Sequence, residues 1–267
     1  MLLQRLLTAL IAIPIVLAAI IYMPPIYFSV VVGVFILIGA WEWSGFLSTT
    51  QKSLRAVYVV LVALGLVTSA FLPETIMLMI ASLMWVWVFI AIVEYQREKP
   101  AVGFQFPVVR GVAGFFILIA TWDAVLTLRT HPSLGPAWLI TVMLLVWGAD
   151  IGAYFAGRFL GHRKLCSRVS PKKTWEGFAG GMVFSIAIAA VCGFYLSLSF
   201  SHYCALLAIA VITALFSVVG DLGVSLFKRM SDMKDSGAIF PGHGGMLDRL
   251  DSIAAATVIF VLGVLFF

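Results

Sequence analysis

Residues 75–94 read TIMLMIASLMWVWVFIAIVE, and this stretch decides the fold class. Its only charged residue is Glu94, at the last position. A helix that spans a membrane needs about 20 predominantly apolar residues. A transmembrane β-strand would be only about 10 residues long and would alternate apolar with polar side chains. The stretch therefore predicts a membrane-spanning helix.

The whole chain shares this apolar character. Of its 267 residues, 63% are apolar and 11% are charged, and the mean hydropathy is +1.11. Soluble domains are about half apolar and about a quarter charged. This composition excludes a soluble globular protein, a disordered chain and a disulfide scaffold. We predict an all-α fold, a polytopic integral membrane helical bundle.

The apolar residues fall into nine segments, which predicts about nine transmembrane helices. No separate water-soluble domain of useful size fits beside them, so a site must be built from helix ends and connecting loops. Charge is uneven, because residues 1–147 hold 12 of the 29 charged side chains and residues 148–252 hold 17. We therefore divide the chain into N-terminal helices, 1–147, and C-terminal helices that carry the polar chemistry, 148–267. The segments are 6–22, 25–47, 54–71, 75–94, 108–128, 136–156, 175–198, 203–224 and 252–267.

The positive charges predict the orientation of the chain in the membrane. With a cytoplasmic N-terminus, 16 of the 17 lysine and arginine residues fall on the cytoplasmic side, and only Arg129 falls outside. Such an excess is the positive-inside signal of membrane proteins. It supports an odd number of spans and explains the isoelectric point of about 9.2 without nucleic-acid binding.

Acidic residues in or beside apolar segments point to a polar site. One such residue near a helix centre costs about 2.5–3.5 kcal/mol if it faces lipid, so these acids must face a cavity, a partner or a metal. If the eighth helix continues past Gly220, then Asp221, Ser225 and Lys228 share one of its faces. The acids are Glu42, Glu94, Asp123, Asp150, Asp221, Asp248 and Asp251.

Three of these acids could hold a metal. Asp248 and Asp251 are three residues apart on one helix, and Asp221 lies on a neighbouring helix. Carboxylate oxygens from two helices are suitable ligands for a hard cation such as Mg²⁺. Salt bridges among the acids and the nearby Lys228 and Arg249 are the alternative.

Two further acids have less certain partners. Asp150 and Tyr154 share a face of the sixth segment, among small residues that allow close helix packing. We favour Asp150 as part of the polar cavity over a bridge to Arg158. Glu42 lies between two tryptophans that we interpret as interfacial anchors, and it fits a structural or a functional role equally.

Two basic regions are candidates for phosphate binding. In Ser170-Pro171-Lys172-Lys173-Thr174, proline suits the first position of a helix and Ser170 its cap, which would place both lysines at a helix N-terminus. The alternative is a loop that touches anionic headgroups. Residues 225–251 form a long charged loop containing Gly242-His243-Gly244-Gly245, and glycine-rich turns expose N–H groups to phosphate oxygens.

The run from Ser225 to Asp251 resembles the signature of phosphatidate cytidylyltransferases, also called CDP-diacylglycerol synthases. That signature reads S-x2-K-R-x4-K-D, a spacer, P-x-H-G-G and D-R-x-D. The stretches at 150–161 and 170–177 also resemble segments of this family. Twelve positions fill the signature without departure: Ser225, Lys228, Arg229, Lys234, Asp235, Pro241, His243, Gly244, Gly245, Asp248, Arg249 and Asp251.

The resemblance implies an integral membrane enzyme that transfers CMP from CTP to phosphatidic acid, giving CDP-diacylglycerol and pyrophosphate. It implies one or two Mg²⁺ ions, held by Asp221 and Asp248 with Asp251 as a further candidate. Some members are dimers, so a homodimer is an open alternative. We expect a bacterial inner membrane, with the active site on its cytoplasmic side.

The candidate roles follow from this resemblance and from the charges. The expected catalytic residues are Asp221, Lys228, Asp248 and Asp251. The expected substrate-binding residues are Asp150, Lys172, Lys173, Ser225, Arg229, Lys234, Asp235, His243, Gly244, Gly245 and Arg249.

Other functions fit the residues less well. A transporter would line a path across the membrane, whereas the charges cluster on one side. An enzyme that consumes CDP-activated lipids would carry D-G-x2-A-R…G-x3-D-x3-D, which is absent from the sequence. A non-enzymatic scaffold would not require separated polar clusters on one face. A CTP-dependent lipid kinase is the nearest alternative in chemistry, and its nucleotide product would be CDP.

Overall fold

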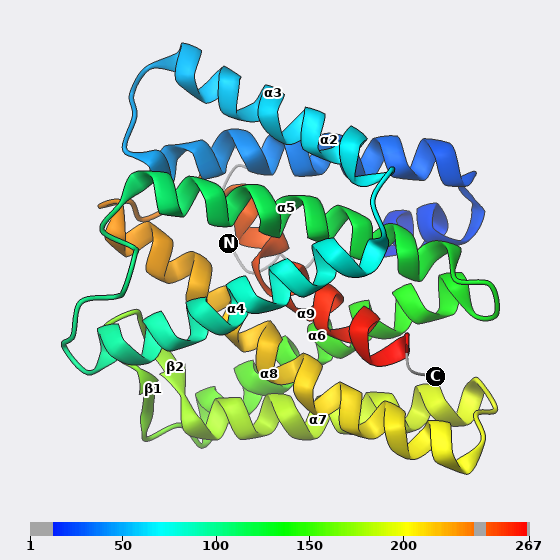
Figure 1. The fold of residues 1–267 in the computed structure, drawn as a ribbon. Coiled ribbons are helices and arrows are strands. Elements are labelled where there is room, and N and C mark those ends of the chain that lie inside the picture. The colour runs from blue at the N-terminus through cyan, green and yellow to red at the C-terminus, as the bar shows by residue number, and fades with distance from the viewer. Residues whose placement is uncertain (1–12, 238–243, 266–267) are drawn as a thin grey trace.

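The computed structural model describes residues 13–237 and 244–265, and the description below is limited to them. The protein is a bundle of long helices with one small hairpin (Figure 1). The elements are α2 (Pro25–Trp43), η1 (Ser44–Leu47), α3 (Lys52–Ser69), α4 (Glu74–Gln96), α5 (Pro107–Thr130), α6 (Gly135–Phe159), β1 (Lys164–Cys166), β2 (Ser170–Thr174), α7 (Trp175–Tyr195), α8 (Phe200–Met230) and α9 (Leu247–Val264). A shorter apolar helix, Ile13–Tyr22, precedes α2.

Seven of the described helices, α2 to α8, are long and apolar enough to cross a membrane. Their outer surfaces are apolar: in α3 the side chains of Val57, Leu61 and Leu64 are 54%, 50% and 57% exposed. Contiguous exposed apolar surface of this kind is typical of contact with lipid or a partner. The chain is thus a multi-pass membrane protein, nearly all-α as predicted. The count of nine spans and the division at residue 147 stay predictions.

The helix boundaries follow local sequence signals. Prolines occupy the first turns of α2, α5 and α6, where the missing N–H costs no helical hydrogen bond. Two differences from the predicted segments matter. α8 continues through Gly220 to Met230, beyond the predicted end at residue 224, and α9 begins at Leu247 instead of residue 252. Both extensions bring charged residues onto regular helix.

Small residues allow α6 and α7 to pack closely. A Cβ atom on Gly152 would lie 2.6 Å from the Gly180 carbonyl oxygen, and one on Gly181 would lie 2.8 Å from that of Ala149. Close helix approach through small residues is a common mode of packing in membranes. α9 contacts α4, α5, α6 and α8, so the last helix lies inside the bundle (Figure 1).

The bundle has two buried apolar clusters. One contains stacked and tilted rings of Trp43, Phe46, Trp87, Phe104 and Phe227, and the other is centred near α6 and the end of α9. Trp43 is 1% exposed and its indole N–H donates to the Arg110 carbonyl oxygen. Its predicted role as an interfacial anchor is therefore wrong, because the side chain points into the bundle.

One end of the bundle gathers the polar connections. The α2–α3 and α4–α5 connections, the β1–β2 hairpin and the end of α8 lie toward the left of Figure 1. Hydrogen bonds join them: Arg110 at the start of α5 donates to the Met230 carbonyl oxygen at 2.6 Å, and Arg229 donates to that of Val169. The predicted site residues that the structure describes come from this end or from the adjoining helical turns.

Candidate active site

A cavity of about 410 Å³ lies between α6, α7 and α8 beside the hairpin. Its wall combines small residues of the close α6–α7 contact with ionisable side chains. These come from α6, from strand β2 and from α8. The charged lining residues are Asp150, Arg158, Lys172, Lys173 and Asp221. A cavity of this size with convergent charges is a suitable binding site for a polar ligand.

An ion pair lies in the wall of this cavity. The Lys173 ammonium lies 2.6 Å from the Asp221 carboxylate, and the two side chains are 26% and 33% exposed. Asp150 and Asp251 are close enough to Asp221 to repel it electrostatically, and Lys173 offsets part of this repulsion. Asp150 lines the cavity, as favoured from the sequence. The alternative, a bridge to Arg158, is not among the described contacts, and Arg158 donates to the Tyr154 hydroxyl.

The lysine pair is held by a strand, so the predicted helix start at Pro171 is wrong. Residues Ser170–Thr174 form β2, which pairs antiparallel with β1 in the register Lys164 to Thr174. α7 begins at Trp175, and its cap is Thr174, whose side chain accepts the Gly177 N–H at 3.1 Å. The lysines thus precede the helix N-terminus by a short extended segment.

The hairpin is fastened to the end of α4. The Gln96 amide oxygen accepts the Arg168 N–H at 3.1 Å, and its amide nitrogen donates to the Ser167 hydroxyl. The Arg168 guanidinium donates to the Tyr95 carbonyl oxygen and lies over the Tyr95 ring. Burial raises the pKa of the Cys166 thiol in the same hairpin. These contacts fix the strand that carries Lys172 and Lys173.

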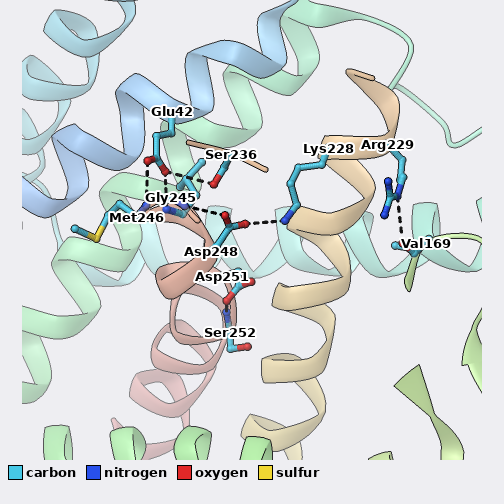
Figure 2. Close-up of polar contacts among 11 residues, drawn as sticks. Glu42, Val169, Lys228, Arg229, Ser236, Gly245, Met246, Asp248, Asp251 and Ser252 are labelled. Atoms are coloured by element: carbon cyan, nitrogen blue, oxygen red, sulfur yellow. Dashed lines mark hydrogen bonds and ion pairs between the residues drawn. The ribbon is translucent and has the colours of Figure 1, made fainter. Parts of the chain in front are cut away.

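A second cluster joins the end of α8 to the start of α9 (Figure 2). The Lys228 ammonium lies 2.7 Å from Asp248 Oδ1, and Asp248 Oδ2 accepts the Gly245 N–H at 3.0 Å. Gly244 has a φ of 79°, a backbone conformation that favours glycine, and a Cβ atom there would lie 2.6 Å from Asp248 Oδ2. The turn therefore requires glycine beside the carboxylate.

Glu42 of α2 also belongs to this cluster. Its carboxylate accepts the backbone N–H groups of Met246 and Leu247 at 3.0 and 2.8 Å, and the Ser236 hydroxyl donates to it at 3.4 Å (Figure 2). A carboxylate inside an apolar segment marks this residue in the sequence, but nothing in the sequence indicates its partners. The structure thus assigns Glu42 a structural contact at the site.

The three predicted metal ligands lie in two places. Asp221 pairs with Lys173, Asp248 pairs with Lys228, and Asp251 accepts the Ser252 N–H at 2.7 Å. Within residues 13–237 and 244–265, no three His, Cys, Asp or Glu side chains converge closely enough to hold a metal ion by themselves. The face shared by Asp221, Ser225 and Lys228 is present, because α8 is continuous through all three.

Comparison with known proteins decides the family. A family model described as the cytidylyltransferase family matches residues 3–267. The chain belongs to the cytidylyltransferase family.

Two relatives that match nearly the whole chain are both named phosphatidate cytidylyltransferase. A phosphatidate cytidylyltransferase of Pseudomonas aeruginosa is 39% identical over 262 residues, which cover 97% of this chain and 96% of the relative. One of Haemophilus influenzae is 35% identical and covers 97% of each chain. One of Bacillus subtilis is 39% identical over 159 residues, 58% of this chain and 57% of that relative.

The remaining candidate residues that the structure describes lie on α8, directly after it, or on α9. Ser225 lies half-buried on α8, between Asp221 and Lys228. Arg229, Lys234, Asp235 and Arg249 are exposed. His243 lies outside the described residues, as does Pro241. The arrangement supplies cations and a glycine turn near carboxylates, which suits binding of phosphate groups together with a cation.

Proposed function

We propose that this protein is a CTP:phosphatidate cytidylyltransferase of phospholipid biosynthesis, which transfers CMP from CTP to phosphatidic acid. The observation that carries the proposal is the relationship to phosphatidate cytidylyltransferases along 97% of the chain. The cavity and its paired charges support it, because both substrates are anionic. The products are CDP-diacylglycerol and pyrophosphate.

The reaction needs positioning more than proton transfer. A phosphate oxygen of phosphatidic acid attacks the α-phosphorus of CTP, a new P–O bond forms, and the bond to the β-phosphate oxygen breaks as pyrophosphate leaves. The second pKa of a phosphomonoester is about 6, so the attacking group is already anionic at neutral pH. No side chain has to act as a general base, and catalysis rests on orientation and charge neutralisation.

We assign the two substrates to the two clusters. Lys228 and the Gly244-Gly245 turn hold the triphosphate of CTP, with the exposed bases Arg229, Lys234 and Arg249 around them. Lys172 and Lys173 hold the phosphate of phosphatidic acid in the cavity. The exposed face of α6 supports this assignment, because Tyr154 lines the cavity and is 52% exposed where acyl chains would lie.

Asp221 and Asp248 are the residues that would hold Mg²⁺, with Asp251 as a further ligand. Their oxygen donors fit this ion, which commonly takes one or two protein carboxylates and completes its shell with water and substrate phosphates. Each of the first two carboxylates faces a lysine ammonium, so each environment already accommodates a positive charge. The ion would supply charge neutralisation on the phosphates.

The proposed placement is a bacterial inner membrane, with nine spans, a cytoplasmic N-terminus and the site at the cytoplasmic surface. The bacterial relatives and the excess of bases on one side support it. The contacts of Arg110 and Arg229 also bring the base-rich connections to one end of the bundle. A homodimer stays a prediction from the family resemblance.

The test follows the label of CTP into lipid. Purified protein in mixed micelles with phosphatidic acid and Mg²⁺ should move the α-³²P label into the lipid fraction and release pyrophosphate. Asp248→Asn should lose most of this activity. Asp123→Asn is the matched control and should stay active, because Asp123 on α5 accepts a hydrogen bond from the Ser69 hydroxyl of α3, away from both ion pairs. Transfer of the γ-label instead would identify a lipid kinase, and transfer of neither label by folded protein would refute the proposal.

A further inference from the structure

Glu42 is a buried acid to which the proposed reaction gives no role. It lies in the last turn of α2 and is 2% exposed. Among the described residues, its hydrogen-bond donors are Ser236, after α8, and Met246 and Leu247, at the start of α9. One carboxylate therefore ties together both sides of the connection between these helices.

The contacts require a carboxylate at this position. Backbone N–H groups at a helix start lack partners within the helix, and a negative charge there is favourable. The cap residue of α9, Met246, makes no side-chain hydrogen bond to the helix start. Glu42 supplies the missing acceptor from another helix, and both of its oxygens are used. A neutral amide would turn one N–H donor toward another donor.

The contacts of Glu42 lead directly to Asp248. A Cβ atom on Gly237 or Gly245 would overlap the Glu42 carboxylate, so both glycines lie against it. The N–H of the same Gly245 donates to Asp248 Oδ2 at 3.0 Å, and Asp248 Oδ1 lies 2.7 Å from Lys228. Figure 2 shows the side chains and backbone from Glu42 through Gly245 and Asp248 to Lys228, in this spatial order from α2 to α8.

We propose that Glu42 is a positioning residue for CTP: it fixes the Gly244-Gly245 turn and the first turn of α9, so that Asp248 and Lys228 face the nucleotide. The inference rests on the proposed function and on its assignment of CTP to this cluster. The inference predicts that a substitution of Glu42 impairs the use of CTP and leaves the binding of phosphatidic acid unchanged. The Lys172–Lys173 strand is anchored to α4 through Gln96, so phosphatidic acid binding does not depend on Glu42.

The test is steady-state kinetics of Glu42→Gln with each substrate varied in turn. The kcat/KM for CTP should fall about tenfold or more, with a higher KM for CTP, because small displacements of a site cost this much. The KM for phosphatidic acid should stay within about twofold of wild type. A mere loss of folded protein would lower the maximal rate and leave both KM values unchanged.

Two further variants show whether a CTP defect is specific to the carboxylate of Glu42. Glu94→Gln is the matched control, because Glu94 also accepts a backbone N–H, that of Val102, at 3.3 Å in a connection outside both clusters. It should keep wild-type KM values. Glu42→Asp retains the charge but has a shorter side chain, so it should show a smaller rise in the KM for CTP. If Glu42→Gln does not fold, the same comparison of the two KM values is made with Glu42→Asp.

Equal changes in both KM values, or a CTP defect of the same size in Glu94→Gln, would overturn the inference. So would a wild-type KM for CTP in folded Glu42→Gln. Asp248→Asn is measured beside them. If it abolishes CMP transfer while Glu42→Gln is normal, only the positioning role fails. If Asp248→Asn is fully active, the proposed site itself fails.

Discussion

Replacing Lys228 with methionine tests whether the Lys228–Asp248 pair is coupled as the structure places it. The two side chains are 15% and 17% exposed, and their charged atoms lie 2.7 Å apart. Methionine keeps much of the side-chain volume and removes the ammonium. Asp248 then keeps the Gly245 N–H at 3.0 Å but lacks its opposite charge.

The expected cost follows from the burial of the pair. Removing one partner of a fully buried pair costs about 3–5 kcal/mol. The remaining exposure and the Gly245 hydrogen bond reduce this, so we expect about 2 kcal/mol, or a midpoint about 4–8 °C lower. The double variant Lys228→Met/Asp248→Asn removes the unpaired charge and should recover about half of the lost stability.

Thermal unfolding in detergent of the wild type, the two single variants and the double variant gives the coupling free energy between Lys228 and Asp248. CMP transfer is measured on the same samples. The double variant should be more stable than Lys228→Met and should remain inactive. Lys173→Met is the matched control: its pair with Asp221 is 26% and 33% exposed, so its loss should cost less than about 1 kcal/mol. Strictly additive losses in the double variant would refute the coupling, and regained activity would refute the assigned roles.

Three other perturbations test other parts of the structure. Gly181→Leu should destabilise the α6–α7 contact by about 1–3 kcal/mol in thermal unfolding, because its Cβ would lie 2.8 Å from a carbonyl oxygen; an unchanged midpoint would contradict this packing. Gln96→Ala should raise the KM for phosphatidic acid and leave that for CTP nearly unchanged, since it frees the hairpin. Because its pKa is raised, the Cys166 thiol should react with maleimide more slowly at pH 8 than in the SDS-denatured chain, as mass spectrometry would report; equal rates would contradict its burial.

Most of the helices could be predicted because lipid imposes a simple rule. A span must be long, apolar and internally hydrogen-bonded, so apolar runs mark helices with little ambiguity. The end of α8 could not be located in this way. Gly220-Asp221-Leu222-Gly223 resembles a helix stop, yet the helix continues because Gly220 packs against the Asp251 backbone and Asp221 pairs with Lys173. Tertiary contacts outweigh the low helix propensity of glycine here.

The start of α7 shows a second limit of the sequence. Ser170-Pro171 fits a helix start, but Thr174 fits one equally, and in the structure Thr174 caps α7. The difference is the partner strand β1, whose pairing with β2 extends the segment. Proline is compatible with an edge strand, so its presence did not decide between the two alternatives.

The site residues could be named from their spacing, but their pairing could not. That Asp221 and Asp248 hold a metal stays a prediction, and the sequence did not indicate that each carboxylate pairs with a lysine of its own in the structure. Glu42 precedes its partners Met246 and Leu247 by about 200 positions in the chain, and only the packing of α2 against α9 brings them together. A lone acid in an apolar run indicates a buried partner without identifying it.

The course of α8 explains how the two proposed substrate sites are kept in register. Asp221 and Lys228 are seven residues apart on one continuous helix, which places them on one face and about 10 Å apart along its axis. Asp221 pairs with the hairpin and Lys228 with α9, so each end of this short stretch holds one of the proposed substrate sites. Ser225 lies between them on the same face. Because a helix resists stretching, the proposed lipid and nucleotide sites are held at a fixed separation, and the reacting phosphates would meet beside Ser225.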